Sequence, residues 1–159
     1  MITATRYHDF SCGHRVVGHE GKCALLHGHN YRVHFTLEPT RAEHSLDRVG
    51  RVIDFSIIKS RLCEWLETHW DHRFLAWTKD SALCALDKHP IIADSIVWLP
   101  VNPTAENLAA YLVDEIGPYV LEGTHARLVH VVVEETRKCS AAASSEFAQQ
   151  LAFPFQKNI

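Results

Sequence analysis

Residues 23–38 read CALLHGHNYRVHFTLE, and the fold is organised around this stretch. From position 30 onward apolar and polar residues alternate, which predicts a strand over 30–38. Its apolar face carries Tyr31, Val33, Phe35 and Leu37. His27 and His29 stand directly before this strand, and in extended chain residues i and i+2 point to the same side. Two imidazoles so placed can bind one metal ion, and Gly28 between them allows close approach of the backbone.

A third histidine extends this pattern. His14 follows a looser alternation over 2–10 that predicts another strand, and Gly13 before it could mark a bulge that re-aims the histidine. Three neutral imidazoles with one open position are typical of catalytic zinc sites. Cys23 would then be a nucleophile or a base beside the metal. A lone His-x-His is more often an exposed polar turn and a lone cysteine a small buried residue, so both assignments depend on the rest of the chain.

The composition is that of one folded domain over residues 1–159. Hydrophobic residues make up 47% and charged residues 22% of the chain, an ordinary globular balance. With 16 Lys plus Arg against 19 Asp plus Glu, the net charge is -3. Such a chain has no broad attraction for phosphate backbones, so no nucleic acid is expected as a partner.

We expect no export or membrane signal in this chain. Its N-terminus lacks the apolar core of a signal peptide, and no run approaches the roughly 20 apolar residues that span a bilayer. The five cysteines form no CxxC pair and are odd in number, so reduced thiols are expected. The sequence therefore predicts a cytoplasmic protein with no membrane partner.

Two amphipathic helices are predicted in the middle of the chain. Ser56 is the expected N-cap of the first, which runs to about position 69 on apolar residues at helical spacing. Thr104 is the expected N-cap of the second, and Glu106 lies in its first turn, where the helix dipole favours an acid. Gly and Pro at 117–118 are expected to end that helix.

Two more strands follow the helices. The first covers 127–136, with valines alternating on one side and Glu135 continuing that apolar side, so its carboxylate needs a charged partner or a ligand. The second is a weaker strand over 144–153, and 77–99 is expected to be an extended connection or lid. The resulting fold class is α+β, a four-stranded antiparallel sheet with two helices on one face. Its exposed edges favour an oligomer.

Six segments in this order give the chain a resemblance to a known family. They are 10–14 (FSCGH), 23–31 (CALLHGHNY), 52–55 (VIDF), 71–72 (DH), 103–107 (PTAEN) and 135–136 (ET). Together they resemble the 6-pyruvoyl-tetrahydropterin synthase and 6-carboxytetrahydropterin synthase family over nearly the whole chain. The resemblance implies a tunnelling fold, in which sheets from several subunits close into a barrel and sites form between subunits.

The resemblance also implies a role for each site residue. Zinc would be held by His14, His27 and His29. Catalysis would use Cys23 as the proton-abstracting thiolate, with Asp71 and His72 as its partners. The pterin ring would be anchored by Glu135, helped by Thr104 and Glu106. Two of these assignments have plain structural alternatives: the Asp71-His72 pair could simply end a helix, and capping-turn electrostatics explains Glu106 fully.

The reaction implied is the conversion of 7,8-dihydroneopterin triphosphate to 6-carboxytetrahydropterin, with loss of triphosphate and acetaldehyde, in 7-deazapurine (queuosine) synthesis. Zinc would ligate the two side-chain hydroxyls and acidify the neighbouring carbon-hydrogen bonds. Two details favour this branch over the pyruvoyl-forming one: the three-residue gap between Cys23 and His27, and the sequence at 52–55. The alternatives from other classes are a zinc hydrolase, which needs a carboxylate base instead of Cys23, and a non-catalytic module that binds pterins or purines.

The chain also departs from the family pattern. Cys12-Gly13 stands where two small residues such as alanines are usual, which puts a second thiol near the expected zinc. The segment 78–101 is longer than in the shortest members, and the tail after Cys139 is atypical.

Overall fold

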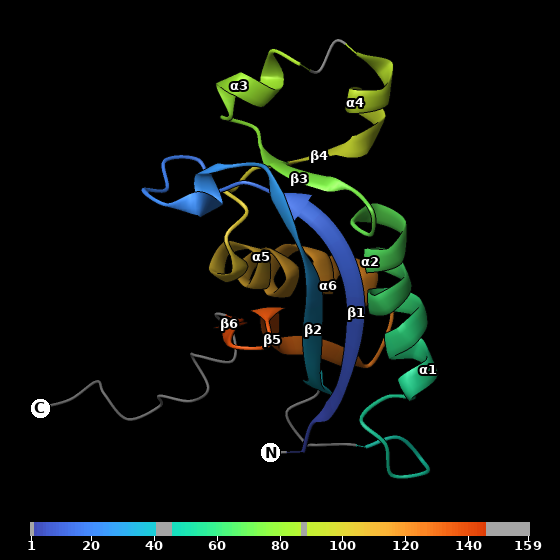
Figure 1. Ribbon diagram of the computed structural model, residues 1–159. Helices are drawn as coiled ribbons and strands as arrows, with labels where there is room; N and C mark the ends of the chain where they lie inside the picture. Colours follow the sequence, from blue (N-terminus) through green and yellow to red (C-terminus); the bar gives the residue numbers. More distant parts are fainter. Residues whose placement is uncertain (1, 41–45, 87–88, 146–159) are drawn as a thin grey trace, which may run out of the picture.

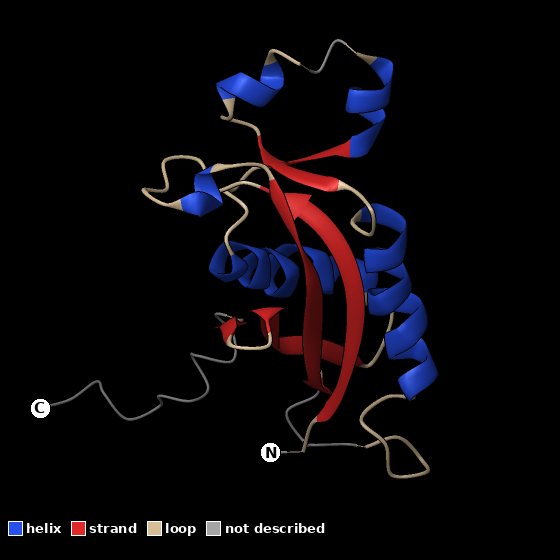
Figure 2. Cartoon of the chain, in the orientation of Figure 1, coloured by secondary structure: helices blue, strands red, loops and turns tan. Residues whose placement is uncertain are grey.

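The computed structural model describes residues 2–40, 46–86 and 89–145. Its centre is a curled sheet with strand order β4-β3-β1-β2-β5-β6 (Figures 1 and 2). Four strands are antiparallel neighbours: β1 (Ala4–His14), β2 (His27–Pro39), β5 (Ala126–Thr136) and β6 (Cys139–Ser144). Two short strands, β3 (Phe74–Trp77) and β4 (Ile96–Leu99), pair in parallel beyond β1.

The α+β class is therefore confirmed, but the predicted sheet of four strands is too small. The extra strands have four residues each, FLAW and IVWL, without the alternation that marks a half-buried strand. The segment 77–99 is not a simple extended connection, because it also forms α3 (Ser81–Cys84) and α4 (Pro90–Ser95). The last strand begins earlier than predicted, at Cys139, and positions 146–153 lie outside the described residues.

Gly13 does not form the predicted bulge. Strand β1 runs through it to His14, and Gly13 pairs with Gly28 on β2. A Cβ atom on Gly13 would lie 2.6 Å from Cδ2 of Phe74, and one on Gly28 would lie 2.9 Å from the carbonyl oxygen of Cys12. Both glycines therefore serve close packing, of β3 over β1 and of β2 against β1.

Each predicted helix is present as a longer, interrupted segment. The first consists of α1 (Phe55–Ile58), a π-helical turn (Lys59–Cys63) and α2 (Glu64–His69). The second consists of α5 (Ala105–Tyr111), a π-helical turn (Leu112–Ile116) and α6 (Gly117–Val120). A 3-10 turn, Lys22–Ala24, precedes β2.

The helix boundaries differ from the predictions at two of three positions. The first cap is Asp54 rather than Ser56, because its carboxylate accepts a hydrogen bond from the Ser56 N–H at 2.8 Å. Thr104 is confirmed as the second cap, accepting from the Asn107 N–H at 3.2 Å. Pro118 does not end the helix, because the chain stays helical from the π-helical turn into α6.

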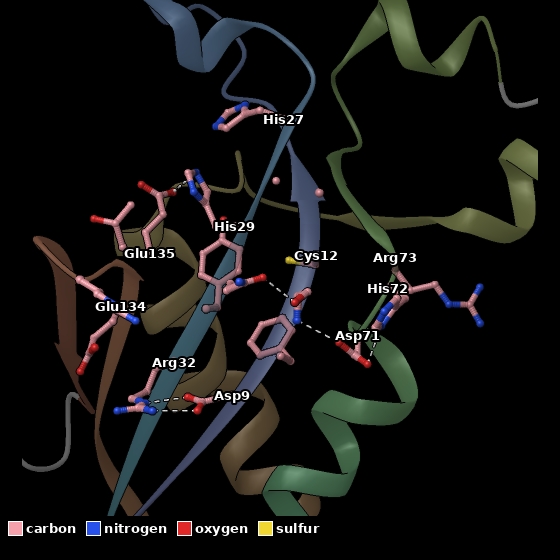
Figure 3. A pocket seen from close by; sticks show the side chains of 18 residues that line it. Asp9, Cys12, His27, His29, Arg32, Asp71, His72, Arg73, Glu134 and Glu135 are labelled. Atoms are coloured by element: carbon pink, nitrogen blue, oxygen red, sulfur yellow. Dashed lines mark hydrogen bonds and ion pairs between the residues drawn. The ribbon is translucent and has the colours of Figure 1, made fainter.

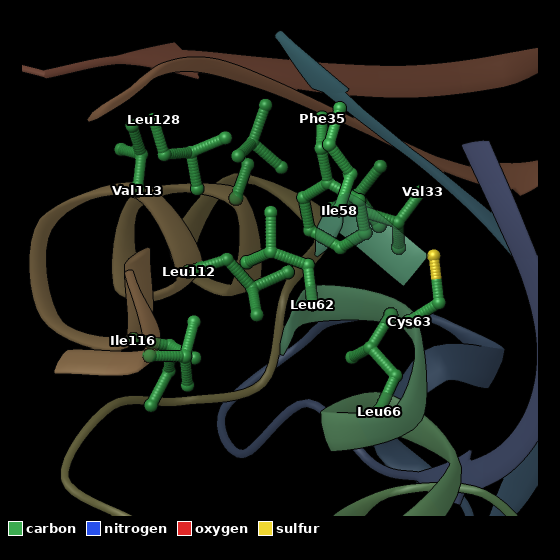
Figure 4. Packing of buried hydrophobic residues seen from close by; sticks show 14 of the residues in the cluster. Val33, Phe35, Ile58, Leu62, Cys63, Leu66, Leu112, Val113, Ile116 and Leu128 are labelled. Carbon is green, nitrogen blue, oxygen red and sulfur yellow. The ribbon is translucent and has the colours of Figure 1, made fainter. Parts of the chain in front are cut away.

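The core lies between the sheet and both helical segments (Figure 4). Ile58, Leu62 and Leu112 from the helices belong to the same buried cluster as Val33 and Phe35 of β2. Both segments therefore cover one face of the sheet, as predicted. Across the described ranges, no helix combines the length and apolar character needed to cross a bilayer.

Candidate metal centre and adjoining cavities

Strand pairing brings the three predicted metal ligands together. In the β1–β2 register His14 lies directly opposite His27, and Cys12 lies opposite His29. The His14 ring centroid is 4.4 Å from that of His27 and 5.2 Å from that of His29, and the His27 and His29 centroids are 4.9 Å apart. One nitrogen of each ring lies within 4.8 Å of the other two.

The rings are oriented so that one nitrogen of each remains available. Nδ1 of His14 lies 2.7 Å from the Pro103 carbonyl oxygen, and Nδ1 of His27 lies 2.8 Å from that of Leu25. Because a carbonyl only accepts, both Nδ1 atoms carry the proton and both Nε2 atoms have a free lone pair. Nε2 of all three histidines is buried and has no hydrogen-bond partner among the described residues.

The pKa values of His14 and His29 suit a bound cation. Burial is the main cause that lowers the pKa of His14 and of His29 below the ordinary histidine value. Neutral imidazole is the form that binds zinc. The three residues thus fit a zinc ion in their number, their donor type and their unpartnered nitrogens.

Glu135 reaches this cluster from β5. Its Oε1 lies 3.4 Å from Nε2 of His14 and 3.7 Å from Nε2 of His29, and Figure 3 shows its carboxylate and the His29 ring turned toward each other. The β5–β6 register shifts between Glu134 and Thr136, so Glu135 is a bulge residue without a partner on β6. Bulges re-aim side chains, which explains how an acid next to a buried strand face points at the histidines.

Two cavities adjoin the cluster, and Glu135 lines both. The smaller, about 280 Å³, is lined by Cys23, Thr104 and Glu106 among others. The larger, about 1530 Å³, is lined by His27, His29, Asp71 and His72 among others. The structure therefore groups Cys23 with the proposed pterin-binding residues, and it does not place Cys23 in one cavity with Asp71 and His72. His14 is buried and lines neither cavity.

Asp71 and His72 are fixed against β1. The Ser11 N–H donates to Oδ1 of Asp71 at 2.9 Å, and the His72 N–H donates to the Ser11 carbonyl at 2.7 Å. Nδ1 of His72 lies 2.7 Å from Oδ2 of Asp71. His72 has φ of 56°, a left-handed conformation that no other non-glycine residue in the described ranges adopts, and its side chain is 83% exposed.

The pKa of Asp71 is lowered by this arrangement. Partial burial raises it, but the hydrogen bonds from the Ser11 N–H and from His72 act in the opposite direction and outweigh burial. Asp71 is therefore a carboxylate at neutral pH, and a carboxylate bound to Nδ1 orients the His72 ring with Nε2 directed outward.

Two residues near the cluster, Tyr31 and Pro103, were not predicted as part of the site, whereas Cys12 was expected close to the metal. The Tyr31 ring packs edge-on against His14 and His29, at centroid distances of 5.9 and 5.6 Å. Its place two residues after His29 on the same strand face was the available signal. Pro103 orients His14 across 89 residues of sequence, which no local pattern reveals. Cys12 is buried beside the cluster, and burial raises the pKa of its thiol, which keeps it protonated.

Comparison with known proteins agrees with this picture. Residues 3–146 match the family model described as 6-pyruvoyl tetrahydropterin synthase. The chain is 35% identical over 139 residues to the 6-carboxy-5,6,7,8-tetrahydropterin synthase of Rickettsia typhi, covering 87% of this chain and 97% of that protein. It is 29% identical over 135 residues to the Synechocystis protein of the same name, covering 85% of each chain.

Solved structures share the fold. An uncharacterised protein from Wolinella succinogenes superposes with a TM-score of 0.77 at 23% identity, covering 91% of this chain and 98% of that one. The Caenorhabditis elegans 6-pyruvoyl tetrahydropterin synthase superposes with a TM-score of 0.62 at 24% identity, covering 91% and 95%. The tunnelling fold is thus confirmed for the single chain, its closure into a barrel of several subunits stays a prediction, and the chain belongs to the 6-pyruvoyl tetrahydropterin synthase family.

Proposed function

We propose that this protein is a zinc-dependent 6-carboxy-5,6,7,8-tetrahydropterin synthase acting in the cytoplasm. It would convert 7,8-dihydroneopterin triphosphate and water to 6-carboxytetrahydropterin, triphosphate and acetaldehyde, a step toward queuosine and other 7-deazapurines. The observation that carries the proposal is the cluster of three imidazoles, each with a buried nitrogen that has no hydrogen-bond partner among the described residues, two of them close to Glu135.

His14, His27 and His29 would hold the zinc. When bound, zinc withdraws electron density from the side-chain hydroxyls of the substrate and makes the adjacent carbon-hydrogen bonds more acidic. The Pro103 and Leu25 carbonyls keep the His14 and His27 rings in the tautomer that this role requires.

Cys23 would take the proton from the substrate side chain as a thiolate. Asp71 and His72 would assist, with Asp71 orienting the ring and a protonated His72 stabilising the negative sulfur. In one chain Cys23 lines a different cavity from Asp71 and His72, so the assisting pair would come from a neighbouring subunit. The exposure of the His72 side chain supports this. Its backbone N–H is bonded to the Ser11 carbonyl, and its ring is accessible to a neighbouring subunit.

Glu135 would anchor the pterin by accepting hydrogen bonds from a ring N–H and the exocyclic amine with its two oxygens. Thr104 and Glu106 line the same smaller cavity and would complete the ring site. In the structure the Thr104 hydroxyl already accepts from Asn107, so its part is to hold the end of α5 against the ring site.

The carboxy-forming branch is favoured by the relatives. The sequence relatives described above are named 6-carboxy-5,6,7,8-tetrahydropterin synthase. The alternative within the family is a pyruvoyl-forming enzyme, which loses triphosphate, rearranges the side chain by internal redox and releases no acetaldehyde.

Incubation with 7,8-dihydroneopterin triphosphate, followed by product identification by mass, tests the proposal. We expect 6-carboxytetrahydropterin and acetaldehyde in equal amounts, and at least a hundredfold loss of activity in Cys23→Ala, as for removal of a general base. His14→Ala should lose bound zinc, while the control His34→Ala, on the opposite face of β2, should keep it. Protein that contains one zinc per chain but leaves the substrate unchanged contradicts the proposal.

A zinc hydrolase is the second candidate, and Glu135 is the observation that favours it. Its Oε1 lies 3.4 Å from Nε2 of His14, where a hydrolase would need a carboxylate base. The same experiment separates the two functions, because a hydrolase should release phosphate without altering the pterin and should survive Cys23→Ala. A non-catalytic binding module would bind the pterin and release nothing.

A further inference from the structure

The carboxylates in the larger cavity all face partners in the described part of the chain. Two are ion-paired or hydrogen-bonded to residues of other elements: Asp9 to Arg32 at 2.6 and 2.8 Å, and Glu134 to His34 at 2.5 Å. The other two belong to the site already described: Asp71 contacts His72, and Glu135 contacts His14 and His29. Their charges are therefore largely balanced inside the cavity.

The arginines of this cavity are not equally engaged. Arg32 is held by Asp9, and Arg73 donates to the carbonyl oxygen of Asp94 and in Figure 3 points away from His27 and His29. Arg137 also lines the cavity, and its side chain makes no hydrogen bond or ion pair with any residue that the structure describes. Arg137 is thus the arginine of this cavity that has no partner among the described residues. It is exposed and lies directly after the end of β5.

Arg137 stands on a turn whose backbone is fixed. The Thr136 hydroxyl oxygen lies 3.2 Å from the N–H groups of Lys138 and Cys139 and accepts from both. The turn directly follows the Glu135 bulge. The β5–β6 hairpin therefore sets the position of Arg137 relative to the histidine cluster. Lys138, the next residue, lines neither of the two cavities.

We propose that Arg137 binds the triphosphate chain of the substrate and thereby selects a phosphorylated pterin. This inference rests on the proposed function. With the ring at Glu135 in the smaller cavity of about 280 Å³, the side chain passes the histidines and the polyphosphate enters the larger cavity of about 1530 Å³. A guanidinium can donate two parallel N–H bonds to phosphate oxygens, which fits the strongly anionic leaving group.

Ligand binding to catalytically blocked protein tests this assignment. Zinc-loaded Cys23→Ala protein is titrated by fluorescence with 7,8-dihydroneopterin triphosphate and with 7,8-dihydroneopterin, which lacks phosphate. When Arg137→Gln is combined with Cys23→Ala, binding of the triphosphate should weaken about tenfold, the size of one charge-assisted contact. The affinity for dihydroneopterin should stay within about twofold of that of the Cys23→Ala protein. The matched control Lys138→Gln removes the same charge one residue away and should change both affinities by less than about twofold.

The outcomes separate this inference from the proposed function. If neither compound binds the Cys23→Ala protein, the proposed function fails and the inference fails with it. If both bind but Arg137→Gln behaves like Lys138→Gln, or weakens both ligands equally, the inference alone is overturned. A selective loss of triphosphate affinity that shrinks at high salt establishes it.

Discussion

Asp71 and His72 are held by one residue of β1, since both the N–H and the carbonyl of Ser11 bind them. This clamp keeps His72 in a left-handed backbone conformation that costs on the order of 1 kcal/mol or more for a residue with a Cβ atom. Such a conformation persists only when the surrounding structure holds it, and it fixes the direction of an exposed ring. The position of this imidazole is therefore set before any partner or substrate arrives.

The lowered pKa of Asp71 gives a pH-dependent stability. Its folded-state value lies below the ordinary 3.8, so the charged form stabilises the fold above that pH, and the contribution disappears as the pH falls through the lowered value. Asp71→Asn keeps an acceptor for Ser11 but removes the charge beside His72. We expect the variant to unfold at lower urea concentration than the unmodified protein at pH 7, with a difference that shrinks steadily below about pH 4.

Urea unfolding at several pH values measures this difference. Asp94→Asn is the control, because Asp94 contacts Arg73 through its backbone carbonyl and its carboxylate makes no hydrogen bond or ion pair with the described residues. An Asp71→Asn effect that stays constant from pH 7 to pH 3 would show that the charge does not contribute.

At the scale of elements, the histidine cluster depends on how closely β1 and β2 approach. Gly13 and Gly28 are paired across the two strands, next to the pair His14 and His27. Added side-chain atoms on either glycine would meet the Phe74 ring or the backbone of Cys12. The close pairing that aligns the imidazoles therefore requires glycine at these positions.

Gly28→Ala should destabilise the protein by about 1–3 kcal/mol, because its Cβ would lie 2.9 Å from a backbone oxygen that cannot move independently. Gly21→Ala is the matched control, since its Cβ would meet only the His19 side chain, at 3.2 Å, and should cost less than about 0.5 kcal/mol. Chemical denaturation of both variants measures the difference. Equal stability of the two would contradict the close-packing argument.

At the scale of the whole molecule, the residues proposed for catalysis are divided between two cavities. Cys23 opens on the smaller cavity, whereas Asp71 and His72 open on the larger one. Leu25 and Leu26, two and three residues after Cys23, are 67% and 61% exposed, which is unusual for large apolar side chains beside a site and favours a covering subunit. An active site completed by a second copy accounts for both features.

Mixed oligomers test this division. Cys23→Ala and His72→Ala should each be inactive alone, but subunits mixed by co-expression should form some sites with an intact Cys23 from one copy and an intact His72 from another. Random mixing in equal amounts predicts about a quarter of the wild-type activity per site. Mixtures that remain as inactive as the separate variants would place both groups in one chain's site.

Local patterns predicted a large part of this protein. Strict alternation gave the buried face of β2, because residues at i and i+2 share a side, and for the same reason it put His27 and His29 on one face. The Thr104 cap followed from local hydrogen-bonding chemistry in the same way. The family resemblance supplied the proposed roles of Asp71, His72 and Glu135, which periodicity alone leaves open.

The strands β3 and β4 escaped prediction because four apolar residues carry no period, and their place in the sheet comes from pairing with distant segments. The direction of the Glu135 side chain could not be predicted either, because it depends on a shift in strand register rather than on the residues next to it in sequence. By itself, the sequence determined which residues could form the sheet, the core face and a metal site. Only the tertiary structure decided that His14 pairs with His27, that Glu135 turns toward them, and that Cys23 and His72 face different cavities, because strand register and bulges are set by contacts between residues far apart in the chain.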